Sequence, residues 1–177
     1  MNYAENEGEI QISALLVQIE ICLQQKLYYV AIMASLVIPD IAGAIDSDNR
    51  GTIQKRYATW YDKYVKPRYA RNLNLTGNLN LTGVECYYLR CSMLHQGKTK
   101  NDKNNKKISF MNFSQLTSPV NPFSLNNELG LLVEPQTFCN NMIYAAYNWL
   151  EVVHDDDHFK KNMKNFMTLY SLSFTDG

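Results

Sequence analysis

The sequence predicts an all-α protein, a helical bundle of five or six helices with a small β-hairpin excursion within residues 108–133. Three observations lead to this fold class. Apolar residues recur every three or four positions through most of the chain, which is helical spacing. The segment Leu27–Ile45 is apolar nearly all round, as in a central helix. Alternating or short apolar runs of strand type occur only near residues 108–113 and 129–133.

Length and composition favour one domain over residues 1–177. A chain of 177 residues with 46% hydrophobic residues is long enough to bury a sizeable core. Lys+Arg and Asp+Glu are both 17, so the formal net charge is zero, which argues against broad electrostatic binding of nucleic acid. The four cysteines are scattered, and the polar N-terminus lacks a secretion pattern, so we predict reduced thiols and a cytoplasmic protein without a membrane span.

Two helices are expected in the first quarter of the chain. Helical spacing starts at Glu9, and the apolar segment Leu27–Ile45 follows as the second helix. Pro39 lacks a backbone donor and is expected to kink or divide that helix near Ile38. Asp40 would then cap the continuation.

The third helix is expected to begin after Thr52, which is a favourable capping residue, and to end near Lys66 because Pro67 follows. Residues 72–83 contain the six-residue unit Asn-Leu-Asn-Leu-Thr-Gly twice. A repeat this short cannot build a solenoid, so we expect a long loop that leads to a helix capped by Thr82.

The next helix, Gly83–Gly97, is predicted to be apolar on two sides. One face holds Val84, Tyr87, Tyr88, Cys91 and Leu94, and the opposite strip holds Cys86, Leu89 and Met93. Two apolar sides require two partners, the core of the same chain and a second subunit. Arg90 and His95 lie roughly 140° apart on an ideal helix. We therefore expect these two side chains to meet across a two-fold axis and not within one helix.

Between this helix and the C-terminal helix pair, the sequence predicts a loop and a hairpin. The polar, basic loop covers about residues 98–107 and is either a contact strip for RNA phosphates or a solvated loop. Ile108–Phe113 and Leu129–Val133 would pair as the hairpin, with Ser114–Glu128 as their connection.

The C-terminal pair comprises a helix around Phe138–Val153 and a last helix that the three aspartates at 155–157 open. With His154 and His158 these aspartates form an oxygen and nitrogen cluster, but acidic residues at a helix start explain them without a metal. Cys86, Cys91 and His95 offer fewer ligands than a structural zinc site uses. We predict no metal site and no cofactor.

Arg90 and His95, within the segment YYLRCSMLHQG, resemble the signature of the HEPN superfamily, an Arg followed four to six residues later by His in an α-helical bundle. The chain departs from that pattern at Cys91, where many members carry a polar residue, and at Gly97, where one subgroup has Tyr. The resemblance implies a homodimer in which both copies of the pair form a metal-independent ribonuclease centre.

The function that this resemblance implies is an RNA endonuclease of a toxin or phage-defence type. Histidine can accept a proton from a 2′-hydroxyl, and arginine can bind the scissile phosphate, so Arg90 and His95 are the candidate catalytic residues. Ser92 and Asp40 are candidate supporting residues that hold the histidine tautomer or contact RNA. Expected partners are a second copy joined through the 83–97 helix, RNA, and an antitoxin or other protein.

Two alternatives remain open. The chain could be a non-catalytic HEPN-like module that binds a protein partner or a nucleotide. For the residues themselves, Arg90 could pair with a nearby acid for structural reasons, and His95 could be a core histidine bonded to a carbonyl group.

Overall fold

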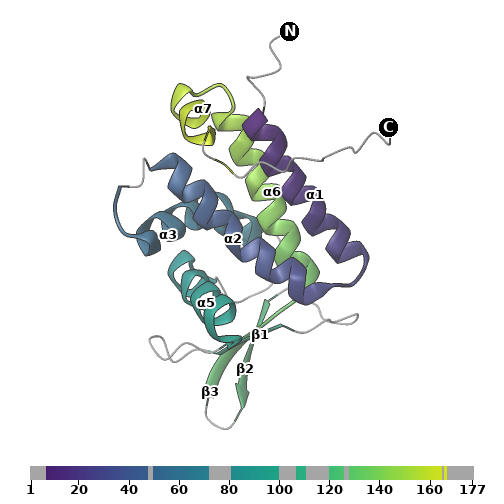
Figure 1. Ribbon diagram of the computed structural model, residues 1–177. Helices are drawn as coiled ribbons and strands as arrows, with labels where there is room; N and C mark the ends of the chain where they lie inside the picture. The colour runs from purple at the N-terminus through teal and green to yellow at the C-terminus, as the bar shows by residue number, and fades with distance from the viewer. Residues whose placement is uncertain are drawn as a thin grey trace.

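A computed structural model describes residues 7–47, 50–71, 81–99, 107–110, 120–125, 128–164 and 166. Helices dominate this part of the chain, and a small sheet interrupts them once, which confirms the predicted fold class (Figure 1). The elements are α1 (Glu7–Gln24), α2 (Tyr28–Asp46), α3 (Ile53–Tyr64), α4 (Lys66–Arg71), α5 (Gly83–Gln96), β1 (Lys107–Phe110), β2 (Val120–Leu125), β3 (Glu128–Val133), α6 (Pro135–Val153) and α7 (Asp157–Met163).

Helix α2 is the central element, as its composition predicts. It contacts α1, α3, α5, α6 and α7 (Figure 1). It is also the one described helix long and apolar enough to cross a membrane, but half of that segment is buried inside the protein, as in the core helix of a soluble protein. The helix continues through Pro39 without a division, so the division of the two predicted outcomes is wrong, and Asp40 lies inside the helix and does not cap a second one.

Aromatic side chains join α3, α6 and α7 in the core. The rings of Trp60 and Trp149 lie 6.1 Å apart edge to face, and Trp149 makes a similar contact with Phe159. The indole Nε1 of Trp149 donates a hydrogen bond of 2.7 Å to the carboxylate of Asp46, so α6 is tied to the end of α2. Such contacts combine apolar burial with directional geometry and therefore fix the packing of these helices.

The sheet differs from the predicted hairpin in its pairing. Its strand order is β1-β3-β2, and the hairpin is formed by β2 and β3, which are antiparallel. The segment beginning at Ile108 is β1, which pairs parallel to β3, with Ile108 opposite Leu131. The predicted connection 114–128 thus contains the true hairpin partner. Both Ile108 and Leu131 are buried, so the pairing is set by burial of these two residues.

Other differences lie at helix ends. A short helix, α4, follows α3 where Pro67 was expected to end the helical structure, and Pro67 occupies its first turn, where a proline is tolerated. The N-cap of α7 is Asp156, in the predicted aspartate run. The duplicated unit is nearly all outside the described residues (72–80), and so is most of the polar loop (100–106).

Candidate Arg/His site on helix α5

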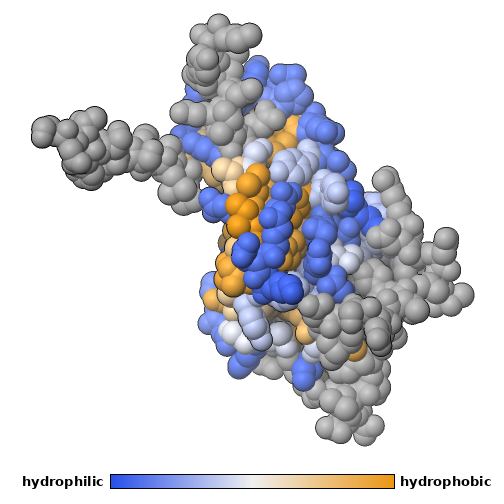
Figure 2. Space-filling view, turned by 90° about the vertical axis from the view of Figure 1, so that its right-hand side faces the viewer, coloured by the Kyte–Doolittle hydropathy of each residue, from blue (hydrophilic) through white to orange (hydrophobic). Residues whose placement is uncertain are grey.

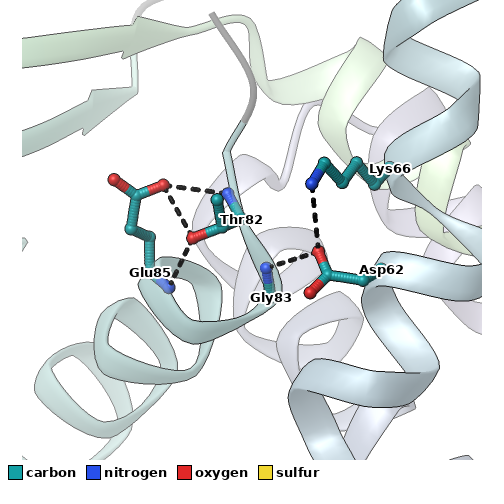
Figure 3. A network of polar contacts seen from close by, with 5 residues as sticks. All are labelled: Asp62, Lys66, Thr82, Gly83 and Glu85. Atoms are coloured by element: carbon teal, nitrogen blue, oxygen red, sulfur yellow. Dashed lines mark hydrogen bonds and ion pairs between the residues drawn. The ribbon is translucent and has the colours of Figure 1, made fainter.

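The start of α5 is held by a capping box. The side chain of Thr82 accepts a hydrogen bond of 3.2 Å from the backbone N–H of Glu85, and the Glu85 carboxylate accepts one of 2.9 Å from the backbone N–H of Thr82 (Figure 3). The helix ends at Gly97, which has a left-handed backbone with φ of 63°. Both predicted helix limits are confirmed, because each depends on local backbone chemistry.

Gly83 sets how closely α5 approaches α3. A Cβ atom at this position would lie 2.5 Å from the carbonyl oxygen of Ala58, so only glycine fits. The backbone N–H of Gly83 donates to the carboxylate of Asp62 at 2.9 Å, and Asp62 also lies 4.0 Å from the ammonium group of Lys66 (Figure 3). This anchor fixes the position of α5 and hence of the residues that follow along it.

The two sides of α5 have different surroundings. Cys86, Leu89 and Ser92 are buried against the rest of the protein, which confirms that the strip containing Cys86 and Leu89 faces the core. The other apolar face is partly open: Val84 is 39% exposed, and Tyr87, Tyr88, Cys91 and Leu94 are half-buried. One predicted partner of the helix is therefore present in the chain itself, and the other face remains partly exposed to solvent.

Arg90 and His95 meet within a single chain. The Nη1 atom of Arg90 lies 3.2 Å from the Nε2 atom of His95. The expectation that one helix cannot bring them together is wrong. The Cα–Cβ bonds of the two residues point in different directions, but the arginine side chain is long enough to reach the imidazole. His95 is exposed and is not the core histidine of the structural alternative.

The same guanidinium group also pairs with an acid on α2. Its Nε atom lies 2.5 Å from Oδ2 of Asp40, although the angles depart from those of a hydrogen bond. The side chains are 22% and 16% exposed, respectively. Burial raises the pKa of Asp40, and the charge of Arg90 opposes that shift. For Arg90, burial acts to lower the pKa, but Asp40 and Cys91 outweigh it and raise the pKa above its ordinary value.

The two candidate supporting residues, Asp40 and Ser92, therefore have different positions relative to the Arg/His pair. Asp40 is brought to Arg90, whereas Ser92 is buried on the core side of α5. Cys91 is half-buried beside Arg90 and Tyr87, and it contributes with burial to raising the pKa of Tyr87. The sequence already indicated that Asp40 needs a charged or polar partner. It is the one charged residue in Leu27–Ile45, and a lone carboxylate in an apolar helix requires a partner.

The hydrogen-bonding roles of the pair follow from the chemistry of arginine. A guanidinium group only donates, so Nε2 of His95 must accept, and the ring proton of the neutral imidazole is then on Nδ1. A carboxylate, a guanidinium and an imidazole thus form a chain from α2 to the surface of α5. This arrangement can bind an anion and accept or return a proton if an incoming phosphate draws Arg90 away from His95.

Other titratable clusters have structural roles. Asp156 accepts a hydrogen bond from the backbone N–H of His158 at 2.7 Å, and Nε2 of His158 lies 2.8 Å from the carbonyl oxygen of Ile45. The thiol of Cys86 is buried, 3.3 Å from the hydroxyl of Tyr57. Within the described ranges, no group of three or more His, Cys, Asp or Glu residues is placed to hold a metal ion.

Comparisons with known proteins give no relative for this chain. No protein-family model matches it, and no curated protein or solved structure does so either. The geometry around α5 must therefore carry any functional argument.

Proposed function

We propose that this chain is a HEPN-like protein that cleaves RNA without a metal ion, with Arg90 and His95 as the catalytic residues. The observation that carries the proposal is the contact of 3.2 Å between Arg90 and an exposed His95 at the end of α5. Exposure matters because an RNA chain is too large to reach a side chain sealed in the core. The proximity matters because cleavage requires a cation at the phosphate and a base at the adjacent 2′-hydroxyl.

In this mechanism the phosphate replaces His95 as a partner of Arg90. The Nη atoms of Arg90 turn to the phosphate oxygens, while Asp40 continues to hold the Nε side of the guanidinium. Nε2 of His95 is then released and takes the proton of the 2′-hydroxyl. Attack of that oxygen on phosphorus expels the 5′-oxygen, which takes a proton from an acid or from water, and gives a 2′,3′-cyclic phosphate.

The proposal includes a homodimer through α5. The partly exposed apolar face beside the pair, with Tyr87 and Leu94, would be covered by the same face of a second subunit. Two copies of the Arg/His pair would then line one cleft and widen the surface that contacts RNA. A cytoplasmic toxin or phage-defence role, with an antitoxin as a protein partner, is the biological setting that the HEPN resemblance suggests.

The test is degradation of single-stranded RNA in EDTA by the wild type, His95→Ala and Arg90→Ala. We expect each substitution to reduce the rate by about 100-fold or more, since each removes an acid–base or charge-stabilising group. His154→Ala is the matched control for the histidine because His154 is also exposed, at the end of α6. Arg68→Ala serves for the arginine, since Arg68 is also half-buried. Equal rates in all five proteins, or no cleavage by any, would reject the catalytic proposal.

One observation favours the non-catalytic alternative. The Asp40 carboxylate already neutralises much of the Arg90 charge, as in a structural ion pair. In that case the partly exposed apolar face of α5 would bind a protein partner. Exposed apolar side chains also occur at Val17, Ile21, Val30 and Met33, on α1 and α2. Figure 2 shows hydrophobic surface beside a hydrophilic ridge on the side of the molecule that carries α1. Binding without RNA cleavage would support this second function.

A further inference from the structure

Helices α1 and α2 share an outward face that is apolar. This outer face of α1 and α2 consists of six exposed or half-buried side chains, namely Val17, Ile21, Tyr29, Val30, Met33 and Val37. Tyr29 is 80% exposed, and four of the others are 36 to 50% exposed. Figure 2 views the side of the molecule that carries α1 and shows hydrophobic surface there. A helix that is apolar all round normally buries every side, so this side of α2 lacks a covering element among the described residues.

The outer face carries no charge that would keep two copies of it apart. Helix α2 contains two charged residues, Asp40 and Asp46, and each has a partner within the chain. Between residues 12 and 24, α1 has one charged residue, Glu20, which lines a groove against α6. In a two-fold contact the same surface meets its own copy, so a charged face would repel itself. The formal net charge of zero likewise produces no long-range repulsion between two chains.

The exposed apolar area is sufficient for a dimer interface. A standard interface buries about 800 Å² on each partner, and roughly 60% of it, or about 500 Å², is apolar. Large apolar and aromatic side chains have areas of about 150 to 250 Å², so the exposed fractions of these six residues amount to an area on the order of 500 Å². Tyr29 and Met33 also belong to residue types that are enriched at interfaces.

The outer face leads to the Arg/His site. Tyr29, Met33 and Val37 recur every four residues and Asp40 follows three residues later, so the four form one stripe along α2. Asp40 pairs with Arg90 of α5. The outer face of α1 and α2 therefore extends toward the partly exposed apolar face of α5, and a single partner can cover parts of both.

We propose that a second copy of this chain packs on the outer face of α1 and α2 about a two-fold axis. The inference deepens the homodimer of the proposed function and rests on it for the shared cleft at α5. It assigns most of the contact to α1 and α2, because four of the five apolar side chains on the outer side of α5 are half-buried and offer less area. The two Arg/His pairs then lie beside the main contact and not at its centre.

The first measurement is sedimentation equilibrium of the wild type up to a concentration of about 200 µM. We expect a dimer with a Kd below about 50 µM, as for an interface of modest strength. A wild type that remains monomeric over this range would overturn the proposal. A series of larger assemblies would overturn it too, because a two-fold contact closes after two copies.

Variants locate the contact. Ile21→Glu combined with Met33→Glu should raise the Kd of the dimer by at least about 100-fold, because like charges would then meet in an apolar interface. Val152→Glu is the matched control, since Val152 is also an exposed apolar residue of a helix, near the end of α6 and outside the outer face. Equal dimerisation by the double variant and the wild type would overturn the assignment.

Urea unfolding tests whether another segment of the same chain covers this face. At a concentration where all the proteins are monomeric, the double variant should have the same urea midpoint as Val152→Glu, because its two substituted side chains are exposed in the monomer. A clearly lower midpoint would mean that the face is packed within one chain, which would overturn the proposal.

Two further results separate this contact from the proposed function. Leu94→Glu, on the outer side of α5, should raise the Kd of the dimer by about tenfold or less, since Leu94 lies toward the margin of the contact. If Leu94→Glu abolishes the dimer and the double variant does not, the dimer forms through α5 alone and this inference falls. If the double variant loses the dimer but the wild type cleaves no RNA, the contact stands and the ribonuclease falls.

Discussion

The two sides of α5 differ in what they contribute. The side with Cys86, Leu89 and Ser92 is buried and is positioned by the Gly83 anchor. The side with Val84, Tyr87 and Leu94 is partly exposed and borders Arg90 and His95. The buried side therefore determines where the helix lies, and the outer side presents reactive and apolar groups. Paired substitutions on the two sides can test this division.

The largest effect is expected from a pair of leucine substitutions. Leu89→Ala should lower the free energy of unfolding by about 3 kcal/mol, since it leaves a cavity at a side chain that is 2% exposed. Leu94→Ala, on the half-buried outer face, should cost less than about 1 kcal/mol. Urea denaturation at low protein concentration measures both. Equal losses would mean that the outer face is packed as tightly as the inner one.

Glycine substitutions at the two ends of the helix come next. Gly83→Ala should cost about 2 kcal/mol, because the new Cβ atom would force the backbone at Ala58 to shift. Gly97→Ala should cost about 1 kcal/mol, because the left-handed backbone is strained by a side chain even though the surrounding space is open. Thermal or urea unfolding distinguishes them. A harmless Gly83→Ala would show that α5 does not depend on this contact.

The buried thiol predicts a loss of stability in alkali. Burial raises the pKa of Cys86 from 9.0 to about 12. The unfolded chain therefore releases this proton first as the pH rises above about 9, and the folded state loses stability until about pH 12. The expected loss between pH 9 and 10 is about 1 kcal/mol. Cys86→Ala should reduce this slope without removing it, because burial also raises the pKa of Cys139 from 9.0 to about 12.

The smallest effect is expected for the ion pair between Asp40 and Arg90. A double-mutant cycle with Asp40→Asn and Arg90→Gln should give a coupling of about 0.5 to 1 kcal/mol, limited by the remaining solvent exposure. The matched exposed pair, Asp62 and Lys66, should give less than about 0.5 kcal/mol. A coupling near zero at Asp40 would indicate that Arg90 is held by other contacts.

Local chemistry in the sequence was sufficient for several features. Thr52 and Thr82 as helix caps and Gly97 as a helix end were all correctly predicted, because each requires only nearby backbone groups. The central position of α2 followed from its apolar composition. The predicted division of α2 at Pro39 was wrong, since packing of α2 on five neighbouring helices stabilises a helix that the proline weakens.

Features that join distant segments were harder to predict. Ile108 pairs with Leu131 in a parallel ladder, and strand patterns alone do not state direction or partner. Asp40 and Arg90 are 50 positions apart, so only the packing of α2 on α5 brings them together. The angle between Arg90 and His95 was right for an ideal helix, but side-chain length decides whether the two groups touch.

Among the strands that the structure describes, β2 lies at an outer edge of the small sheet, and it contains Pro122 opposite Leu131. Proline has no N–H group to offer to a neighbouring chain. A further strand that paired with β2 would therefore lack one backbone hydrogen bond at Pro122. This missing bond disfavours growth of the sheet into a fibril at the β2 edge. Pro122 thus interrupts the row of backbone donors that the edge of β2 would offer to another chain.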